Sequence, residues 1–238
     1  MNSTTTTTRT ARSTLASALC ALALFNPSVA AAQDASAQET LPWEDYDRLQ
    51  ISLLAGLTQP LLLSGGNAQV DLYYKRFVFD WSHGFNLQFD GDTVVGEAAE
   101  QQLSFRMPYT TGFGVGVRLL EWLDVRFEGK LHRFEVREAS ASDPSFSYNT
   151  ATLGAGVYAR YRPFYHFGLA AKMPQWTHGF VIAPSVRYWP NVWSSLEDDE
   201  LVYDNASTGA RETHSALRAG LANTPLVANI GLGYMITF

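Results

Sequence analysis

The final segment of the chain constrains its fold more than any other feature. Its apolar side chains recur at every second position: Leu226, Ala228, Ile230, Leu232, Tyr234, Ile236 and Phe238. A period of two over residues 226–238 predicts a half-buried β-strand. Strands of soluble proteins most often have about 5 to 6 residues, whereas a tilted strand that spans a membrane needs about 9 to 11. The segment therefore favours a membrane-spanning strand.

The same alternation recurs along the chain and predicts eight strands. We expect them within residues 48–63, 70–74, 77–89, 103–119, 123–131, 153–161, 180–188 and 226–238. In 77–89 and 103–119 the odd positions are expected to form one outward apolar face throughout. An even number of alternating strands is what a closed bacterial barrel requires. The predicted fold class is all-β, an eight-stranded antiparallel transmembrane β-barrel.

The connections between these strands predict two unlike ends. Turns at 75–76, 120–122 and 163–175 fall at one end, and polar loops at 90–100, 138–148 and 194–222 fall at the other. Short periplasmic turns and longer external loops are typical of outer-membrane barrels. The pair Lys75-Arg76 is poor turn chemistry, so whether it forms a true hairpin turn is left open.

The first 32 residues read as a secretory signal peptide. Arg9 and Arg12 precede the apolar stretch 15–25, and Ala30, Ala31 and Ala32 offer small residues for cleavage. Cys20 lies inside this segment after a leucine, so we expect no lipid anchor. The predicted organisation is a cleaved signal peptide (1–32), a short periplasmic segment (33–47) and a barrel (48–238).

The charge of the mature chain excludes one class of partner. Cleavage after residue 32 leaves 15 basic and 23 acidic side chains, a net charge of −8. Nucleic-acid binding calls for a basic surface, so the acidic mature chain is not expected to bind nucleic acid. The mature chain has no cysteine, which excludes disulfides and thiolate metal sites. Mean hydropathy is −0.09 although aromatic residues make up 13% of the chain. A transmembrane barrel gives that combination because only its outward face is apolar.

From about residue 45 onward, the chain resembles small bacterial outer-membrane barrels of the OmpA, OmpX and OmpW type, by pattern and not by a family motif. In such barrels a terminal aromatic residue after an alternating strand carries the assembly signal. The resemblance assigns that signal to Gly233, Ile236 and Phe238. It implies an outer-membrane location, with the barrel assembly machinery, outer-membrane lipid and lipopolysaccharide as partners. We expect a monomer.

The inward positions of the predicted strands carry charge. The expected lumen network comprises Asp80, Arg106, Arg118, Asp124, Arg126, Glu128, Lys130, Arg160, Arg162 and Arg187. The interior of eight strands is just wide enough to be filled by side chains, and buried charges are tolerated only when they are paired or wetted. We therefore expect a packed ion-pair network without catalysis. A narrow anion-passing pore is the alternative.

An enzyme of the lipid A-modifying kind is a second alternative. His214-Ser215 is faintly similar to the paired His and Ser of outer-membrane deacylases, but the two are adjacent here and alternation sends them to opposite faces. His83 is a second candidate, and an interfacial histidine among aromatic residues is commoner than a catalytic one. We expect no catalytic residue, cofactor or metal. The acidic run 197–200 is interpreted as a solvated external loop and not as a cation site.

Aromatic residues near the predicted strand ends are expected at the two membrane interfaces, where amphipathic rings are favoured. They are Tyr73, Trp81, Trp122, Trp176, Tyr188, Trp189 and Trp193.

Overall fold

The computed structural model describes residues 48–90, 103–138, 144, 146–167, 169, 172, 174–204, 208–216 and 225–238. The predicted signal peptide (1–32) and the segment 33–47 up to the barrel lie outside these residues. So does most of the predicted loop at 90–100.

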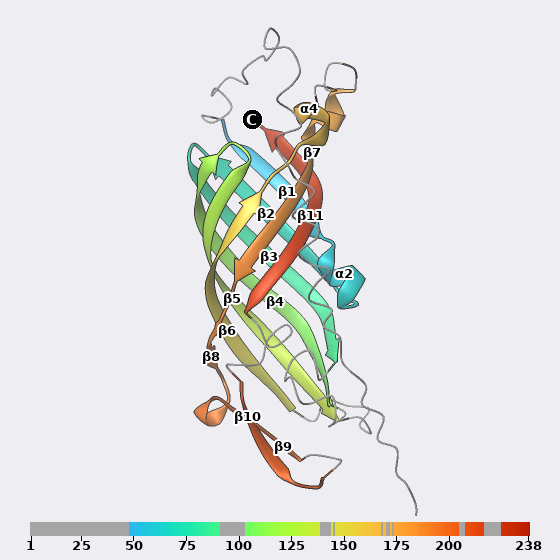
Figure 1. The fold of residues 1–238 in the computed structure, drawn as a ribbon, viewed down its shortest axis with the longest axis vertical. Coiled ribbons are helices and arrows are strands. Elements are labelled where there is room, and N and C mark those ends of the chain that lie inside the picture. The colour runs from blue at the N-terminus through green and yellow to red at the C-terminus, as the bar shows by residue number, and fades with distance from the viewer. Residues whose placement is uncertain are drawn as a thin grey trace, which may run out of the picture. The chain divides into compact units, whose positions relative to one another are not determined.

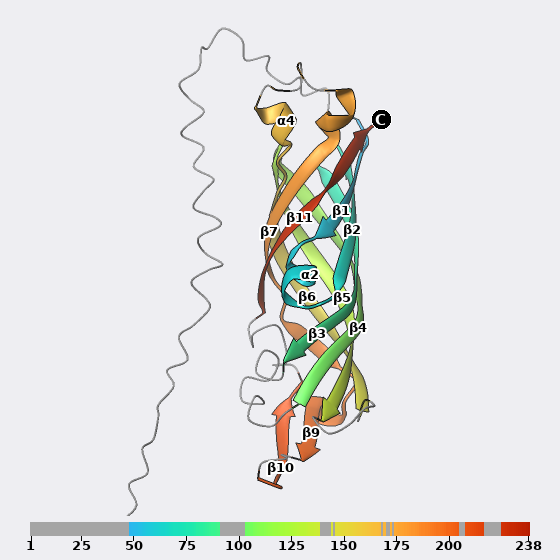
Figure 2. The same ribbon diagram turned by 90° about the vertical axis from the view of Figure 1, so that its right-hand side faces the viewer.

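Eight strands of the described chain form the barrel (Figures 1 and 2). They are β1 (Gln50–Gly56), β2 (Gly66–Tyr74), β3 (Phe77–Asp90), β4 (Leu103–Leu120), β5 (Leu123–Glu138), β6 (Phe146–Ala159), β7 (Phe180–Tyr188) and β11 (Leu226–Thr237). All neighbours pair antiparallel in the order β5-β4-β3-β2-β1-β11-β7-β6, and β5 pairs with β6 to close the ring. The predicted eight-stranded barrel is confirmed.

One end of the barrel, here called the turn end, carries the short connections. Tyr74 pairs with Phe77 across Lys75-Arg76, and Lys75 has a positive φ of 52°. The predicted hairpin is therefore confirmed, since the left-handed backbone at Lys75 supplies the twist that a tight hairpin needs. Glu121 and Trp122 join β4 to β5, and the short helices α4 (Pro163–His166) and η5 (Gln175–Gly179) join β6 to β7. The C-terminus lies at this end too (Figure 1).

The first strand is shorter than its sequence pattern predicts. The alternation continues to Leu63, but β1 ends at Gly56 and residues Thr58–Leu62 form the helix α2. Pro60 explains the change, because it has no N–H for a strand ladder yet is tolerated in the first turn of a helix. The amide of Leu63 bonds the carbonyl oxygen of Gln59 at 2.8 Å. The prediction of one strand over 48–63 was wrong in its second half.

The outside of the barrel is apolar from the turn end to the level of Phe85. We call this surface the apolar belt. It comprises the exposed residues Leu53, Phe77, Phe79, Trp81, Phe85, Tyr109, Phe113, Val115, Val117, Leu119, Phe127, Leu131, Leu153, Val157, Phe180, Tyr188, Leu226, Ile230, Leu232, Tyr234 and Ile236. Water alone would disfavour so large an exposed apolar surface. A lipid environment explains it.

The alternation inverts where β3 and β4 leave the apolar belt. The pairs Phe85–Tyr109 and Leu87–Met107 bracket Asn86, which has a φ of 54°, and Pro108, which has no N–H to donate. The β4–β5 register also shifts between Arg106 and Tyr109. Such bulges turn a strand's side chains to the other face. We call this feature the inversion point.

Beyond the inversion point, β3 to β6 continue as a four-stranded extension with an apolar inner face. Leu87, Phe105 and Met107 are at most 7% exposed, so the prediction that they face outward was wrong. In β5 the alternation continues without a bulge, and the residue types change instead. The outward residues change from the apolar Leu131 to the charged Arg133, and the inward residues change from the polar His132 to the apolar Phe134.

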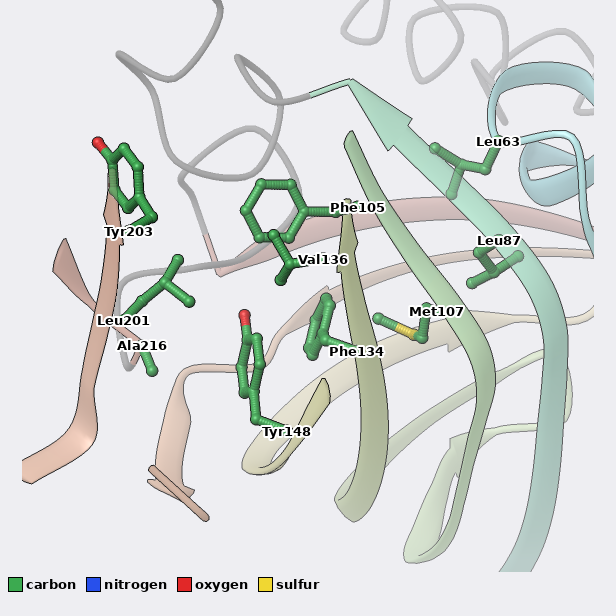
Figure 3. Packing of buried hydrophobic residues seen from close by; sticks show 10 residues of the cluster. All are labelled: Leu63, Leu87, Phe105, Met107, Phe134, Val136, Tyr148, Leu201, Tyr203 and Ala216. Atoms are coloured by element: carbon green, nitrogen blue, oxygen red, sulfur yellow. The ribbon is translucent and has the colours of Figure 1, made fainter. Parts of the chain in front are cut away.

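A hairpin packs against the inner face of this extension. β8 (Asn191–Ser194) ends where the predicted polar loop 194–222 begins. The loop region itself contains η6 (Glu197–Asp199), β9 (Glu200–Asp204) and β10 (Arg211–Ser215). Leu201, Tyr203 and Ala216 join a buried cluster with residues of the extension (Figure 3). β9 and β10 lie at the end opposite the C-terminus, here called the loop end (Figures 1 and 2). None of the helices in the described ranges has the length and apolarity needed to cross a membrane.

Candidate functional site: the charged lumen

The centre of the lumen is organised around the guanidinium of Arg126. Its Nη1 lies 2.8 Å from Oδ1 of Asp71 and 3.3 Å from Oδ2 of Asp80, and its Nε lies 2.5 Å from Oδ1 of Asp124. These four side chains are at most 2% exposed. Three carboxylates on β2, β3 and β5 therefore share one cation in the interior of the barrel.

Neutral polar groups complete the coordination of Asp71. Its Oδ1 accepts a hydrogen bond from Nε2 of Gln69 at 2.7 Å, and its Oδ2 accepts one from the hydroxyl of Tyr73 at 2.9 Å. The Oε1 of the same glutamine accepts a hydrogen bond from Nη2 of Arg187 at 3.1 Å. Gln69 thereby links the cation on β7 to the acid on β2. Both carboxylate oxygens of Asp71 therefore accept hydrogen bonds, which makes the burial of its charge tolerable.

Two tyrosine rings contact cations of the lumen. The guanidiniums of Arg126 and Arg187 lie 4.0 and 4.7 Å from the centre of the Tyr158 ring. Those of Arg160 and Arg118 lie 3.9 and 4.6 Å from the centre of the Tyr73 ring. A cation over an aromatic face is attracted to the ring quadrupole, and the attraction is stronger when both groups are desolvated. Each ring therefore stabilises the buried cations that contact it.

Near the turn end, two arginines converge on one amide oxygen. Arg118 Nη2 donates to Oε1 of Gln50 at 3.0 Å, and Arg160 Nη1 donates to the same oxygen at 3.5 Å. Arg160 Nη2 also donates to the carbonyl oxygen of Glu121 at 2.6 Å. The cations at this end are thus bound by neutral acceptors in the β1 strand and the β4–β5 turn.

Toward the loop end, the network passes from charged to neutral pairs. Lys130 donates from Nζ to the hydroxyl of Ser82, and its Nζ lies 4.2 Å from the centre of the Trp189 ring. His132 lies between Thr110 and Thr152, whose hydroxyl oxygens are 2.8 and 3.0 Å from its ring nitrogens. The next inward residue of β5 is Phe134, in the buried apolar cluster of the extension. The polar part of the lumen therefore ends at His132.

Glycines on both sides of β5 make room for its long charged side chains. Arg126 pairs with Gly116 and Gly156, and Glu128 pairs with Gly114 and Gly154. A Cβ atom on Gly114 would lie 2.2 Å from Oδ2 of Asp80 and 2.9 Å from Cγ of Glu128. The space beside Gly114 is therefore filled by the side chains of Asp80 and Glu128. The run of inward glycines in β4 reflects the volume that the network occupies.

Most of the residues predicted for the network line the lumen. Asp80, Arg118, Asp124, Arg126, Glu128, Lys130, Arg160 and Arg187 are all buried. Within this network, Oε1 of Glu128 accepts a hydrogen bond from the hydroxyl of Tyr158.

Two predicted members lie elsewhere. Arg106 is beyond the inversion point, where its side chain is 38% exposed and its Nη1 lies 3.5 Å from Oε2 of Glu135. Arg162 follows the end of β6 and donates from Nε to the carbonyl oxygen of His178 at 3.1 Å, at the turn end of the barrel. The placement of Arg106 was wrong because the bulge reverses the face. The placement of Arg162 was wrong because the strand ends at Ala159.

Sequence reasoning missed Asp71 and misplaced two aromatic residues. Asp71 was available in the alternation, since Val70, Leu72 and Tyr74 face outward and leave Asp71 and Tyr73 inward. Tyr73 was expected at a membrane interface but is buried against Arg118 and Arg160. Trp189 was expected there as well, yet its ring contacts Lys130. With Asp71 added, the buried lumen charges of the described residues are five basic and four acidic, much closer to balance than the sequence alone suggested.

The described residues give limited support to other chemistry. Within them, no group of three or more His, Cys, Asp or Glu side chains is arranged to hold a metal ion. His214 and Ser215, the candidate enzyme pair, are consecutive residues of β10. His83 lies in β3, where its ring stacks on that of Trp81 at 5.9 Å between centres.

A closed ring of eight antiparallel strands, an apolar outside and a charged inside together define a transmembrane β-barrel of the outer-membrane class. No protein-family model matches the chain, and no curated protein sequence matches it.

Among solved structures, the chain is similar to Ail, the attachment invasion locus protein of Yersinia pestis. The crystal structure of Ail with the heparin analogue sucrose octasulfate has 11% identity, a TM-score of 0.34, and coverage of 79% of this chain and 97% of that chain. The backbone structure of Ail, named as an outer-membrane protein, in a phospholipid bilayer nanodisc has 16% identity, a TM-score of 0.31, and coverage of 81% and 99%. TM-scores this low add nothing to the fold assignment, which rests on the strand pairing of this chain.

Proposed function

We propose that the protein is an integral outer-membrane barrel with a structural or surface-interaction role and a lumen closed by its own side chains. The observation that carries the proposal is the hub at Arg126, which ties Asp71, Asp80 and Asp124 together in the interior. Opening a channel there would require desolvated charges to part, and separating a buried ion pair costs several kcal/mol, about 3 to 5. The hub therefore favours a plug over a pore.

The outer surface supports the proposed location and orientation. Aromatic and branched apolar side chains cover the eight strands in the apolar belt, while the outward residues of the extension are polar. Long strands and the β9–β10 hairpin gather at the loop end (Figure 2). In outer-membrane barrels the longer connections face the outside of the cell. The loop end is accordingly the external end, and the chain acts there as a monomer.

The role at that surface is tested with the full mature protein. We would purify it from outer membranes in mild detergent, reconstitute it in planar bilayers and record its conductance, and in parallel measure the mass of lipid A incubated with it. We expect no steady conductance and unchanged lipid A. Stable anion-selective steps would replace the plug with a narrow pore.

Loss of acyl mass from lipid A would instead establish a lipid-modifying enzyme, and activity that disappears in His214→Ala would place the reaction at that residue. The location is tested separately by cell fractionation. Recovery of the folded chain in the soluble periplasmic fraction would refute the proposed membrane location whatever the outcome of the functional assays.

A further inference from the structure

A cluster of arginines lies on the outer face of the extension, next to the apolar belt. Arg133, Glu135 and Arg137 alternate along β5, and Arg106 of β4 pairs with Glu135. We call these three arginines the arginine patch. Positions diagonal to one another on the same face of a sheet lie about 7 to 8 Å apart, so their long side chains reach a common ligand.

The three guanidiniums outnumber the carboxylates that the strand pairing places on that face. Oε2 of Glu135 lies 3.5 Å from Nη1 of Arg106, and Asp90 of β3 pairs with Ser104, which in turn pairs with Arg137. Arg106 Nε donates to Oδ1 of Asn86 at 2.9 Å, and Arg133 Nη2 donates to the hydroxyl of Ser147 at 2.9 Å. Arg137 Nε is buried and has no hydrogen-bond partner in the described part of the chain.

These contacts orient the guanidiniums without using all of their donors. Asn86 and Ser147 are neutral, so they position the side chains without adding negative charge, and the face keeps a net positive charge. The planar fork of an arginine matches the oxygens of a phosphate and binds it through paired, charge-assisted hydrogen bonds. The patch therefore has the chemistry of a phosphate site.

The position of the patch along the barrel axis indicates which kind of phosphate could reach it. Tyr109 pairs with Arg133 and is exposed in the apolar belt, and Leu131 lies two residues before Arg133 on the same face of β5. The patch thus begins where the lipid-facing surface ends, on the external side if the orientation proposed above holds.

We propose that the arginine patch binds the phosphate groups of lipopolysaccharide in the outer leaflet. The inference rests on the proposed function, because it needs the loop end to face the outside of the cell. A lipid whose acyl chains cover the apolar belt would place its phosphorylated head group against Arg106, Arg133 and Arg137. A phospholipid head group and free phosphate share the chemistry, and the experiment separates them.

The test measures binding of fluorescent lipopolysaccharide to the full mature protein in detergent micelles. For the double variant Arg106→Gln/Arg133→Gln we expect a dissociation constant raised at least about tenfold, because the variant loses charge-assisted hydrogen bonds to the phosphate oxygens. Arg106→Lys/Arg133→Lys should lose less, because it keeps the charge. Glu135→Gln should bind more tightly, because it removes the competing carboxylate. Arg211→Gln on β10 is the matched control and should bind like the wild type.

The source of the phosphate is decided by competition. Dephosphorylated lipid A should compete poorly, and inorganic phosphate or phosphatidylglycerol vesicles should compete only at much higher concentration. Equal competition by phosphatidylglycerol would overturn the assignment to lipopolysaccharide. Unchanged binding in a double variant that still shows folded mobility on unheated gels would overturn the site itself. Because binding is measured on purified protein, this result is independent of cell fractionation, which tests the proposed membrane location.

Discussion

At the residue scale, Arg126 is the side chain on which the lumen depends most. Replacing it with methionine keeps much of its volume but leaves Asp71, Asp80 and Asp124 without their shared cation. We expect Arg126→Met to lower the free energy of unfolding by about 3 to 5 kcal/mol, the cost of leaving buried charge uncompensated. Urea unfolding in detergent, followed by tryptophan fluorescence, measures it. Arg211→Met, at an exposed position of β10, is the control, and an equal effect of the two changes would refute the hub.

Gly114 gives a second prediction at this scale. Its missing side chain leaves the space that Asp80 and Glu128 fill, so Gly114→Ala should destabilise the barrel by about 1 to 3 kcal/mol through overpacking. Gly231→Ala is the matched control, because a Cβ there meets its nearest atoms at ordinary distances of 3.5 to 3.6 Å. The same unfolding titration compares them. Equal stability of the two variants would show that the network has room to move.

At the element scale, the inversion point separates two arrangements of β4 that a labelling experiment distinguishes. The single cysteine of the chain, Cys20, lies in the expected signal peptide, so introduced cysteines report alone. A water-soluble maleimide applied to intact cells should label Arg106→Cys and Ser104→Cys, whose positions face outward in water. It should fail at Met107→Cys, which faces the buried cluster, and at Val115→Cys, which faces lipid. Labelling at Met107→Cys with protection at Arg106→Cys would contradict the reversal of faces and would favour an alternation that continues without interruption.

The sequence predicted the strands well but not the places where they change. Leu87, Phe105 and Met107 keep the odd parity of the apolar belt, so the order of apolar letters is unbroken across the inversion point. The reversal comes from the backbone at Asn86 and Pro108. Leu61 and Leu63 likewise continue the parity of β1, although the strand ends at Gly56 and Pro60 lies in the helix that follows. A period-two pattern identifies two faces, but it does not say when a bulge exchanges them.

At the scale of the whole molecule, the predicted assembly signal stays a prediction. Its residues lie where the last strand, β11, pairs with the first strand, β1. Ile236 pairs with Ile51 across the closure of β1 with β11, and the amide of Phe238 donates to the carbonyl oxygen of Leu49 at 2.9 Å. Removing Phe238 should lower the amount of folded protein in the outer membrane, measured by mobility on unheated gels. Phe238→Tyr keeps an aromatic ring and serves as the control. Wild-type amounts after the removal would contradict a role in recognition by the assembly machinery.

The lumen was predictable in composition but not in pairing. Eight of the ten expected residues are buried, because the alternation of β5 continues unbroken from Asp124 to His132. Which acid meets which base depends on how strands distant in sequence face one another across the barrel. Arg126 reaches Asp71, 55 positions away, and no spacing rule within one strand gives that contact.

The inversion point also fixes the height at which the molecule can sit. Sliding the extension into the bilayer would carry Arg133 and Arg137 into hydrocarbon, where a lipid-facing arginine costs about 2 to 4 kcal/mol at the midplane. Sliding it outward would bring Phe85, Tyr109 and Leu131 into water. Both displacements raise the free energy, so the barrel has one preferred depth in the bilayer. The β9–β10 hairpin is thereby carried at a set distance above the membrane surface.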